Sequence, residues 1–212
     1  MTGPAATDRL AALAAEVGPP DAGPVVAVGG RTQWHVGAAP GGSGAVDGSA
    51  PSDGSGPVDG GGPASGSSTP GGGAPVREVR APAGVVTVEA ADMTVRVGAG
   101  TTVADLDGAL AEVDQTVALP CWPGATVGGV LAVGHSGLRR LGWGPVRDTL
   151  LEVRYVSAEG TVVKAGGPTV KNVSGFDLCR LLVGSLGTLG VLAEVVLRTR
   201  PRGDRASSPV TR

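Results

Sequence analysis

The sequence predicts an α+β protein, and three features of its 212 residues predict that class. Apolar runs of strand length face each other across short turns, as in residues 85–89 and 93–97, which predicts antiparallel hairpins. Amphipathic stretches of helical length stand between the strands. Three Gly-rich loops each adjoin a strand or a helix, and one of them lies in residues 122–148. We expect the rest of the chain to be organised around that stretch.

Composition and charge exclude several classes of protein. The net charge is −2, so no basic surface for nucleic acid or an anionic membrane is predicted. One Tyr, one Phe and three Trp are too few for base-stacking platforms. Cys121 and Cys179 form no CxxC pair, so we predict no metal site and no disulfide, and expect two buried thiols. No signal-peptide pattern or membrane-spanning apolar run is found, which predicts a cytoplasmic protein without a transmembrane segment.

The N-terminal part of the chain predicts one helix and one strand. Residues 7–17 carry apolar side chains at helical spacing, and Gly18-Pro19-Pro20 ends that helix. Residues 25–28 predict a short buried strand. The strand runs directly into Gly29, Gly30, Arg31, Thr32 and Gln33. Two glycines and a hydroxyl after a strand can form a nest of N–H donors for an anion, although a hairpin or a plain loop fits the same residues.

Residues 38–75 consist almost entirely of Gly, Pro, Ser, Ala and Asp. Such a segment cannot bury enough apolar surface to offset its ordering entropy. We therefore predict a disordered insert within a single domain that spans residues 1–200, with 201–212 as a flexible tail. The structured sequence on either side must then pair across the insert, which loop-closure entropy permits at modest cost.

A strand, the glycines of residues 98–100 and a helix over residues 103–113 imitate a dinucleotide-binding fingerprint. Val103 stands where the third glycine belongs, and no acidic residue ends a following strand at the expected distance. We therefore discount a Rossmann fold. Residues 115–119 predict a short strand that leads into the central stretch.

The central stretch reads WPGATVGGVLAVGHSGLRRLGWGPVRD. Residues 123–126 predict a turn, and Gly128-Gly129 predicts a helix start whose free N–H groups face an anion. Arg139, Arg140 and Arg147 add positive charge. Each helix-end interaction contributes roughly 0.3–1 kcal/mol, so several loops must converge to hold a dinucleotide. A pyrophosphate cradle and an ordinary Gly-rich loop both fit this stretch.

The C-terminal part predicts a second hairpin and a closing strand. Residues 150–157 and 161–165 pair across a tight turn. Residues 171–175 are a predicted loop and residues 176–183 a short helix. The third Gly-rich loop, residues 184–190, precedes a closing strand over residues 191–200.

Taken together, the three loops resemble the FAD-binding domain of the vanillyl-alcohol oxidase/PCMH flavoproteins, in which FAD lies between two small α/β subdomains. VGGRTQW is similar to the first phosphate loop of that family. PGATVGGVLAVGHSG followed by GPVRD is similar to the second loop, and VKNVSGFDLCRLLVGSLGTLGVL to the third. The resemblance covers residues 7–37 and 76–200. Its loop sequences most resemble those of the FAD-binding subunit of bacterial glycolate oxidase. Leu186 stands where many FAD-linked oxidases carry Glu.

The resemblance implies specific cofactor contacts. The first loop would cradle the pyrophosphate, the second would line the ADP and ring portions, and the third would present backbone groups to the isoalloxazine. The residues concerned are Gly29, Gly30, Arg31, Thr32, Gln33, Gly124, Ala125, Thr126, Gly128, Gly129, His135, Ser136, Gly137, Gly187, Thr188, Leu189, Gly190 and Val191. Arg31 stands where some relatives carry a histidine bonded to the flavin, so we expect noncovalent FAD. No catalytic residue is assigned.

Two functions follow from the resemblance. The first is a subunit or fragment of an FAD-dependent oxidoreductase that oxidises a 2-hydroxy acid such as glycolate or lactate by hydride transfer to the flavin. Other oxidase subunits, including an iron-sulfur subunit, would be its partners. The second is a noncatalytic or degenerate flavin-binding module. Relatives continue into a cap that supplies acid–base groups, so we expect this chain to be incomplete as a catalyst on its own.

Overall fold

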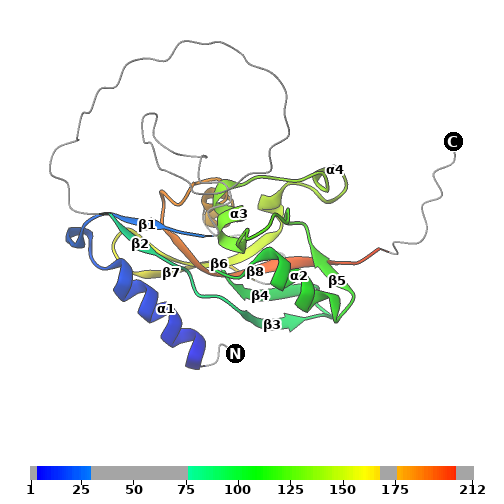
Figure 1. The fold of residues 1–212 in the computed structure, drawn as a ribbon, viewed down its shortest axis with the longest axis horizontal. Helices are drawn as coiled ribbons and strands as arrows, with labels where there is room; N and C mark the ends of the chain where they lie inside the picture. The colour runs from blue at the N-terminus through cyan, green and yellow to red at the C-terminus, as the bar shows by residue number, and fades with distance from the viewer. Residues whose placement is uncertain (1–3, 30–75, 168–175, 204–212) are drawn as a thin grey trace, which may run out of the picture.

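The computed structural model describes residues 4–29, 76–167 and 176–203. A six-stranded sheet in the order β3-β4-β8-β6-β7, with β5 also paired to β8, forms its centre (Figure 1). All neighbouring strands in this sheet are antiparallel. The strands are β3 (Val85–Glu89), β4 (Thr94–Gly98), β5 (Gln115–Val117), β6 (Leu150–Val156), β7 (Val162–Gly166) and β8 (Val191–Pro201). Both predicted hairpins and the closing strand are confirmed.

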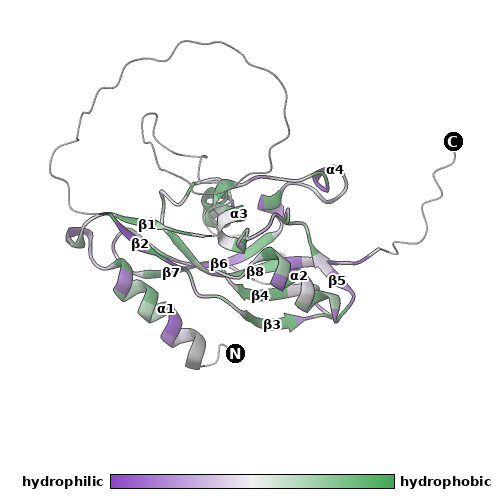
Figure 2. Cartoon of the chain, viewed as in Figure 1, coloured by the Kyte–Doolittle hydropathy of each residue, from purple (hydrophilic) through white to green (hydrophobic). Residues whose placement is uncertain are grey.

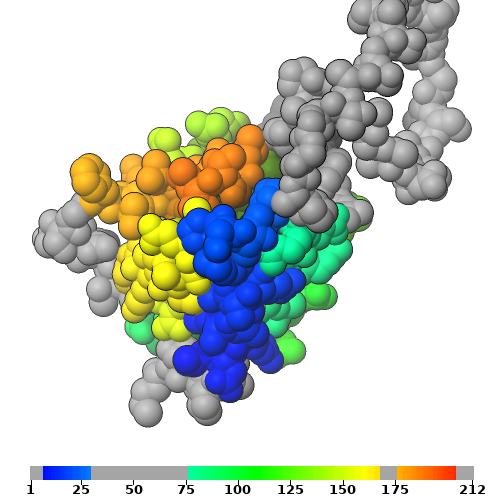
Figure 3. All heavy atoms as spheres, turned by 90° about the vertical axis from the view of Figure 1, so that its left-hand side faces the viewer, coloured from blue at the N-terminus to red at the C-terminus, as the bar shows by residue number. Residues whose placement is uncertain are grey.

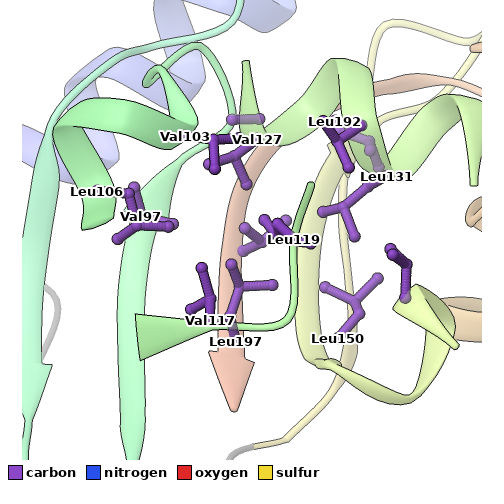
Figure 4. Close-up of a cluster of buried hydrophobic side chains, with 14 of the residues drawn as sticks. Val97, Val103, Leu106, Val117, Leu119, Val127, Leu131, Leu150, Leu192 and Leu197 are labelled. Carbon is purple, nitrogen blue, oxygen red and sulfur yellow. The ribbon is translucent and has the colours of Figure 1, made fainter. Parts of the chain in front are cut away.

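The main core lies between the sheet and three helices, α2 (Val103–Ala111), α3 (Val127–Val133) and α5 (Leu178–Leu182). Val95 and Val97 of β4 and Val195 and Leu197 of β8 point into it two residues apart, as the two-residue period of a strand requires. Figure 4 shows Val97, Leu197 and Leu192 of the sheet among side chains of the helices and of the segment after β5. Fully burying each such side chain contributes roughly 1.5–3 kcal/mol, so this layer fixes α3 firmly on the sheet.

A second, smaller core joins α1 (Pro4–Val17) to one end of the sheet. Leu10, Leu13 and Val17 lie on one helical face and pack against Val79, Val156, Val191 and Ala193. Figure 2 shows α1 with alternating hydrophilic and hydrophobic bands, as expected for a helix with one buried side. Arg77 closes the helix end, because its guanidinium donates to the carbonyl oxygens of Glu16 at 2.8 Å and Val17 at 2.9 Å.

Strands β1 (Val25–Ala27) and β2 (Arg77–Val79) form a separate parallel pair, with Val25 opposite Arg77. This pairing confirms that the structured sequence before and after the predicted insert comes together. The insert itself, residues 38–75, lies outside the described residues, as does the tail from residue 204.

Several boundaries differ from the sequence prediction. Helix α1 begins at Pro4, and α5 begins at Leu178 rather than at residue 176. Three short helical segments had no clear sequence signal, and these are η1 (Pro20–Ala22), α4 (Arg140–Trp143) and η2 (Val146–Asp148). Their few residues show too little periodicity to be distinguished from turns.

The glycines of residues 98–100 serve packing. A Cβ at Gly98 would overlap the carbonyl oxygen of Pro82, and one at Gly100 would overlap that of Ala81. Gly100 N–H also donates to Pro82 O at 2.8 Å. The glycines therefore allow the chain before β3 to lie against the β4–α2 connection. Together with the antiparallel sheet, this contact confirms that the apparent fingerprint is no Rossmann motif.

The face of the sheet opposite the main core carries a network of charges. Arg96 on β4 contacts Glu152 at 3.0 Å and Glu194 at 2.9 Å, and the side chains of these two carboxylates are only 1% and 5% exposed. Arg154 lies 3.4 Å from Glu194, and Lys164 lies 3.2 Å from Glu152. Burial alone would lower the pKa of Arg96, but its hydrogen bonds to Glu194 and Glu152 raise that pKa above its ordinary value.

None of the described helices has both the length and the apolar composition needed to span a bilayer.

Candidate functional site

The Gly-rich loops converge on α3. Gly29, where the first loop begins, lies against the start of this helix, since a Cβ there would be 2.5 Å from Thr126 Oγ1 and 3.8 Å from Gly129 Cα. The third loop lies at the other end, where a Cβ on Gly134 would be 3.0 Å from Gly184 Cα. Seven helical residues span about 10 Å. One short helix therefore separates Gly29 from the third loop by a fixed distance.

The N-terminal donors of α3 are not free, contrary to the sequence prediction. Gly128 N–H donates to Ala99 O at 2.7 Å, and Val127 N–H donates to Thr101 O at 2.8 Å. Gly129 N–H donates to the hydroxyl of the capping residue Thr126 at 3.2 Å. These bonds satisfy the groups that would otherwise bind an anion at a helix start. The first turn of α3 is therefore a packing element.

The third loop closes the C-terminal end of α3. Gly184 N–H donates to Leu131 O at 3.0 Å, and Leu186 N–H donates to Ala132 O at 2.8 Å. Gly134 has a left-handed backbone, with φ of 70°, and ends the helix. The helix and the third loop thus satisfy each other's backbone groups and form one unit.

A groove of about 390 Å³ lies between this unit and the N-terminal segment. Its walls are residues 17–20 and 23–27, the end of β6 with the two residues after it, and residues of the third loop. Figure 3 shows the N-terminal segment (blue) beside the third loop (orange) and the β6–β7 region (yellow). Among the described residues, none that lines the groove is charged. The polar groups are backbone amides and the hydroxyls of Ser157 and Thr188. Such a lining suits a large, mainly uncharged ring system more than a small ion.

Backbone donors without acceptors stand at two places in the site. The N–H groups of Gly187 and Leu189 in the third loop donate to no acceptor among the described residues. In the segment after α3, the N–H groups of His135, Ser136 and Gly137 are likewise unpaired within the described part of the chain. Polar backbone groups in folded proteins are nearly always satisfied, so these donors are available to solvent or to a ligand.

Comparison with known proteins decides the family. The FAD-binding domain family matches residues 57–166, which is just over half of the chain. The chain belongs to this family. Its α+β architecture is the PCMH-type FAD-binding fold, and FAD is its cofactor. The match begins inside the predicted insert and ends before the third loop, so the first and third loops lie outside the matched residues.

Individual relatives extend the similarity. The glycolate oxidase subunit GlcE of Escherichia coli strain K12 is 39% identical over 140 residues, which are 64% of this chain and 39% of that protein. The D-lactate dehydrogenase of Archaeoglobus fulgidus is 41% identical over 108 residues, or 50% of this chain and 24% of that protein. The chain thus spans about two fifths or less of these relatives. Alkyldihydroxyacetonephosphate synthase has a similar fold, with a TM-score of 0.51 at 22% identity over 59% of this chain and 23% of that one.

The described residues fit FAD. Its diphosphate and flavin ring carry acceptors that need N–H donors, and the third loop and residues 135–137 supply unpaired ones. Glycine at position 29 keeps the approach to Thr126 open, because a Cβ there would lie 2.5 Å from the hydroxyl. The uncharged groove offers apolar walls for a planar ring. A neutral site of this kind needs no net basic protein.

The structure places the predicted site residues in three groups. Gly29, Thr126 and Gly129 meet at the start of α3, whereas Gly187, Thr188, Gly190 and Val191 line the groove. Gly128 packs against Ala99, and Ala125 is buried, so both act in packing. The remaining predicted residues of the first loop, Gly30, Arg31, Thr32 and Gln33, lie outside the described residues.

The segment after α3 is anchored by side chains. The His135 ring contacts Trp122 edge-on, with centroids 5.0 Å apart. Ser136 Oγ accepts a hydrogen bond from Val146 N–H at 3.2 Å. Gly137 lies against Pro120, and Gly124 adopts a left-handed turn with φ of 72°. The His135 ring therefore packs against Trp122, and no geometry identifies it as a catalytic base.

Sequence reasoning missed two parts of the site. One is the groove wall formed by Pro19, Pro20 and Pro24. In the sequence, Pro19 and Pro20 indicated only the end of a helix, and Pro24 had no assigned role. The other is Leu186, which has a left-handed backbone although it is not a glycine. No local sequence signal distinguishes a leucine in that conformation.

The two cysteines differ in environment, which corrects the expectation that both are buried. Cys179 is buried, but Cys121, directly before Trp122, is exposed. Burial raises the pKa of the Cys179 thiol to about 11, with help from the charges of Asp177 and Glu152. The thiolate is the reactive form, so Cys179 should be inert at ordinary pH.

We predict that iodoacetamide at pH 8 modifies one thiol of the native chain and two thiols after denaturation. Mass spectrometry of peptides should place the native modification on Cys121. The Cys121→Ser variant is the control and should remain unmodified while folded. Equal rates at the two positions in the native chain would contradict the assigned environments.

Proposed function

We propose that this chain is the FAD-binding part of an oxidoreductase that oxidises a 2-hydroxy acid of the glycolate or lactate type. The observation that carries the proposal is the meeting of Gly-rich loops at α3 beside an uncharged groove with unpaired N–H donors. The names of the relatives, glycolate oxidase subunit and D-lactate dehydrogenase, support the substrate class. We further propose a single FAD-binding domain over residues 1–200, a cytoplasmic location, and other oxidase subunits, including an iron-sulfur subunit, as partners.

The cofactor would be held noncovalently by backbone groups. In this proposal Gly29 to Gln33, with Gly124, Thr126 and Gly129, surround the pyrophosphate and ADP portions, and His135 to Gly137 contribute further contacts. Ala125 and Gly128 support this turn by packing. Gly187 to Val191 lie along the flavin ring, with the N–H groups of Gly187 and Leu189 as donors. When bound, FAD supplies the acceptor for a hydride from the substrate. The apolar side chains of Val25, Val26 and Val156 would keep water away from the buried edge of the cofactor.

We predict that the 212-residue chain binds FAD but oxidises glycolate and D-lactate poorly or not at all. Oxidation needs a base within hydrogen-bond reach of the substrate hydroxyl and a cation to hold the carboxylate. The groove has no charged lining residue, and His135 is turned edge-on to Trp122. Steady-state turnover with an artificial electron acceptor tests this, with and without candidate partner subunits. Rates on the order of 10 s⁻¹, typical of complete enzymes, would show that the described chain already contains the catalytic groups.

The alternative function is a noncatalytic flavin-binding module. It is supported by the described lining residues of the groove, none of which is an acid–base group. The two functions differ in one measurement. An oxidoreductase subunit should gain turnover of a 2-hydroxy acid when its partner subunits are added. A binding module should retain FAD and show no turnover in any combination.

A further inference from the structure

We infer that Leu186 is a positioning residue for FAD, because its left-handed backbone directs the third loop toward the groove. The inference rests on the proposed function. It concerns a residue of the third loop for which the resemblance shows a leucine in place of Glu but implies no contact with the cofactor.

The backbone of Leu186 is unusual. Its φ is 55°, and among the described residues only Met93 (52°) and Asp114 (54°) are other non-glycine residues with positive φ. Asp tolerates this region and Met93 lies in the β3–β4 turn, whereas leucine gains nothing from it locally. A conformation that is locally unfavourable persists only where the surrounding structure holds it, and such positions often occur at ligand sites.

Two hydrogen bonds hold Leu186 in this conformation. Its own N–H donates to Ala132 O at 2.8 Å, and Gly184 N–H donates to Leu131 O at 3.0 Å. Both acceptors are carbonyl groups at the end of α3 that need partners. The strained residue is therefore tied to the helix that also contacts the first loop.

The left-handed turn continues into the groove. Gly187 follows with φ of 78°, and Gly187, Thr188 and Gly190 then line the groove, as Leu186 itself does. The N–H groups of Gly187 and Leu189 come directly after this turn and have no acceptor among the described residues. If Leu186 adopted an ordinary negative φ, the following peptide groups would rotate, and Gly187, Thr188 and Gly190 would leave their present positions in the groove wall. The left-handed backbone of Leu186 thus holds the third loop in the binding-competent conformation before the cofactor binds.

The test compares Leu186→Val with Leu186→Asn. Valine is β-branched and strongly disfavours positive φ, whereas asparagine adopts it readily. Met93→Val is the matched control, because it imposes the same backbone penalty on a half-exposed residue remote from the groove. FAD dissociation constants are measured by titration of the full chain, and amide hydrogen exchange of residues 184–186 is measured without FAD.

We expect Leu186→Val to weaken FAD binding about tenfold, because the fraction of loops in the competent conformation falls. It should also speed exchange at residues 184–186 about tenfold. Leu186→Asn should bind FAD within about threefold of the parent chain, since asparagine restores the left-handed backbone. Met93→Val should lower thermal stability without changing FAD affinity.

Unchanged affinity in Leu186→Val, or equal losses in the valine and asparagine variants, would overturn the inference. If the parent chain binds no FAD, the proposed function fails. The exchange measurement then still shows whether Leu186 holds the loop to α3, so the two failures are distinguishable.

Discussion

Gly129→Val should abolish FAD binding, with affinity lower by at least about 100-fold. Gly129 lies in the first turn of α3, and a Cβ there would be 3.0 Å from Thr126 Oγ1. The same hydroxyl is the contact of Gly29 in the first loop. A branched side chain at position 129 would therefore displace the helix cap and fill the space between the helix and the first loop. Titration of the purified variant with FAD measures the loss.

Gly108→Val is the matched control for this prediction. Gly108 is also a helical glycine, it lies on the exposed side of α2, and a Cβ there would have no neighbour within 4 Å. This variant should fold and bind FAD as the parent chain does. Copurification of stoichiometric FAD with Gly129→Val would mean that the start of α3 lies away from the cofactor.

Arg96→Ala should lower the free energy of unfolding by about 3 kcal/mol, because removing one partner leaves buried charges uncompensated. Arg96 contacts both Glu152 and Glu194, which are almost completely buried. The effect should lie at the lower end of the usual range of about 3–5 kcal/mol, since Arg154 and Lys164 still contact the carboxylates. For a chain of this size the melting temperature should fall by roughly 6–12 °C. Urea unfolding measures the change.

Two further variants show whether the charge is the cause. Arg198→Ala removes an arginine from β8 for which no ion pair is found among the described residues, and it should cost less than about 1 kcal/mol. Adding Glu194→Gln to Arg96→Ala should cost less than the sum of the two single changes, because the neutral amide no longer needs the cation. Additive losses would contradict a coupled network.

The sequence predicted most of the fold because its elements have clear local signals. Residues 150–156 and 162–166 alternate around a tight turn and form β6 and β7 as expected. Gly128-Gly129 and the apolar run after them predicted the start of α3 to within one residue. The structured sequence on either side of the low-complexity segment was expected to pair across it, and β1 does pair with β2, although residues 77–79 were not predicted as a strand. Each of these depends on periodicity or capping, which neighbouring residues determine.

The candidate site was less predictable because its chemistry depends on contacts between distant segments. Gly128-Gly129 suggested free helix donors, yet the carbonyl of Ala99 and the hydroxyl of Thr126 occupy them. The donors that remain unpaired come from the third loop and from residues 135–137. Only the folded arrangement shows which glycines face a ligand and which allow close packing. The exposure of Cys121 and the left-handed backbone of Leu186 likewise depend on tertiary structure.

The most direct test of the account is the flavin content of the purified chain. The protein is incubated with excess FAD, separated from free flavin by gel filtration, and its absorbance spectrum recorded. It is then precipitated with acid. We predict a yellow protein with about one FAD per chain, as expected for a single site of this family, and complete release of the flavin into the supernatant because it is held without a covalent bond. A colourless protein, or flavin that remains with the precipitate, would contradict a noncovalent FAD site formed by the Gly-rich loops around α3.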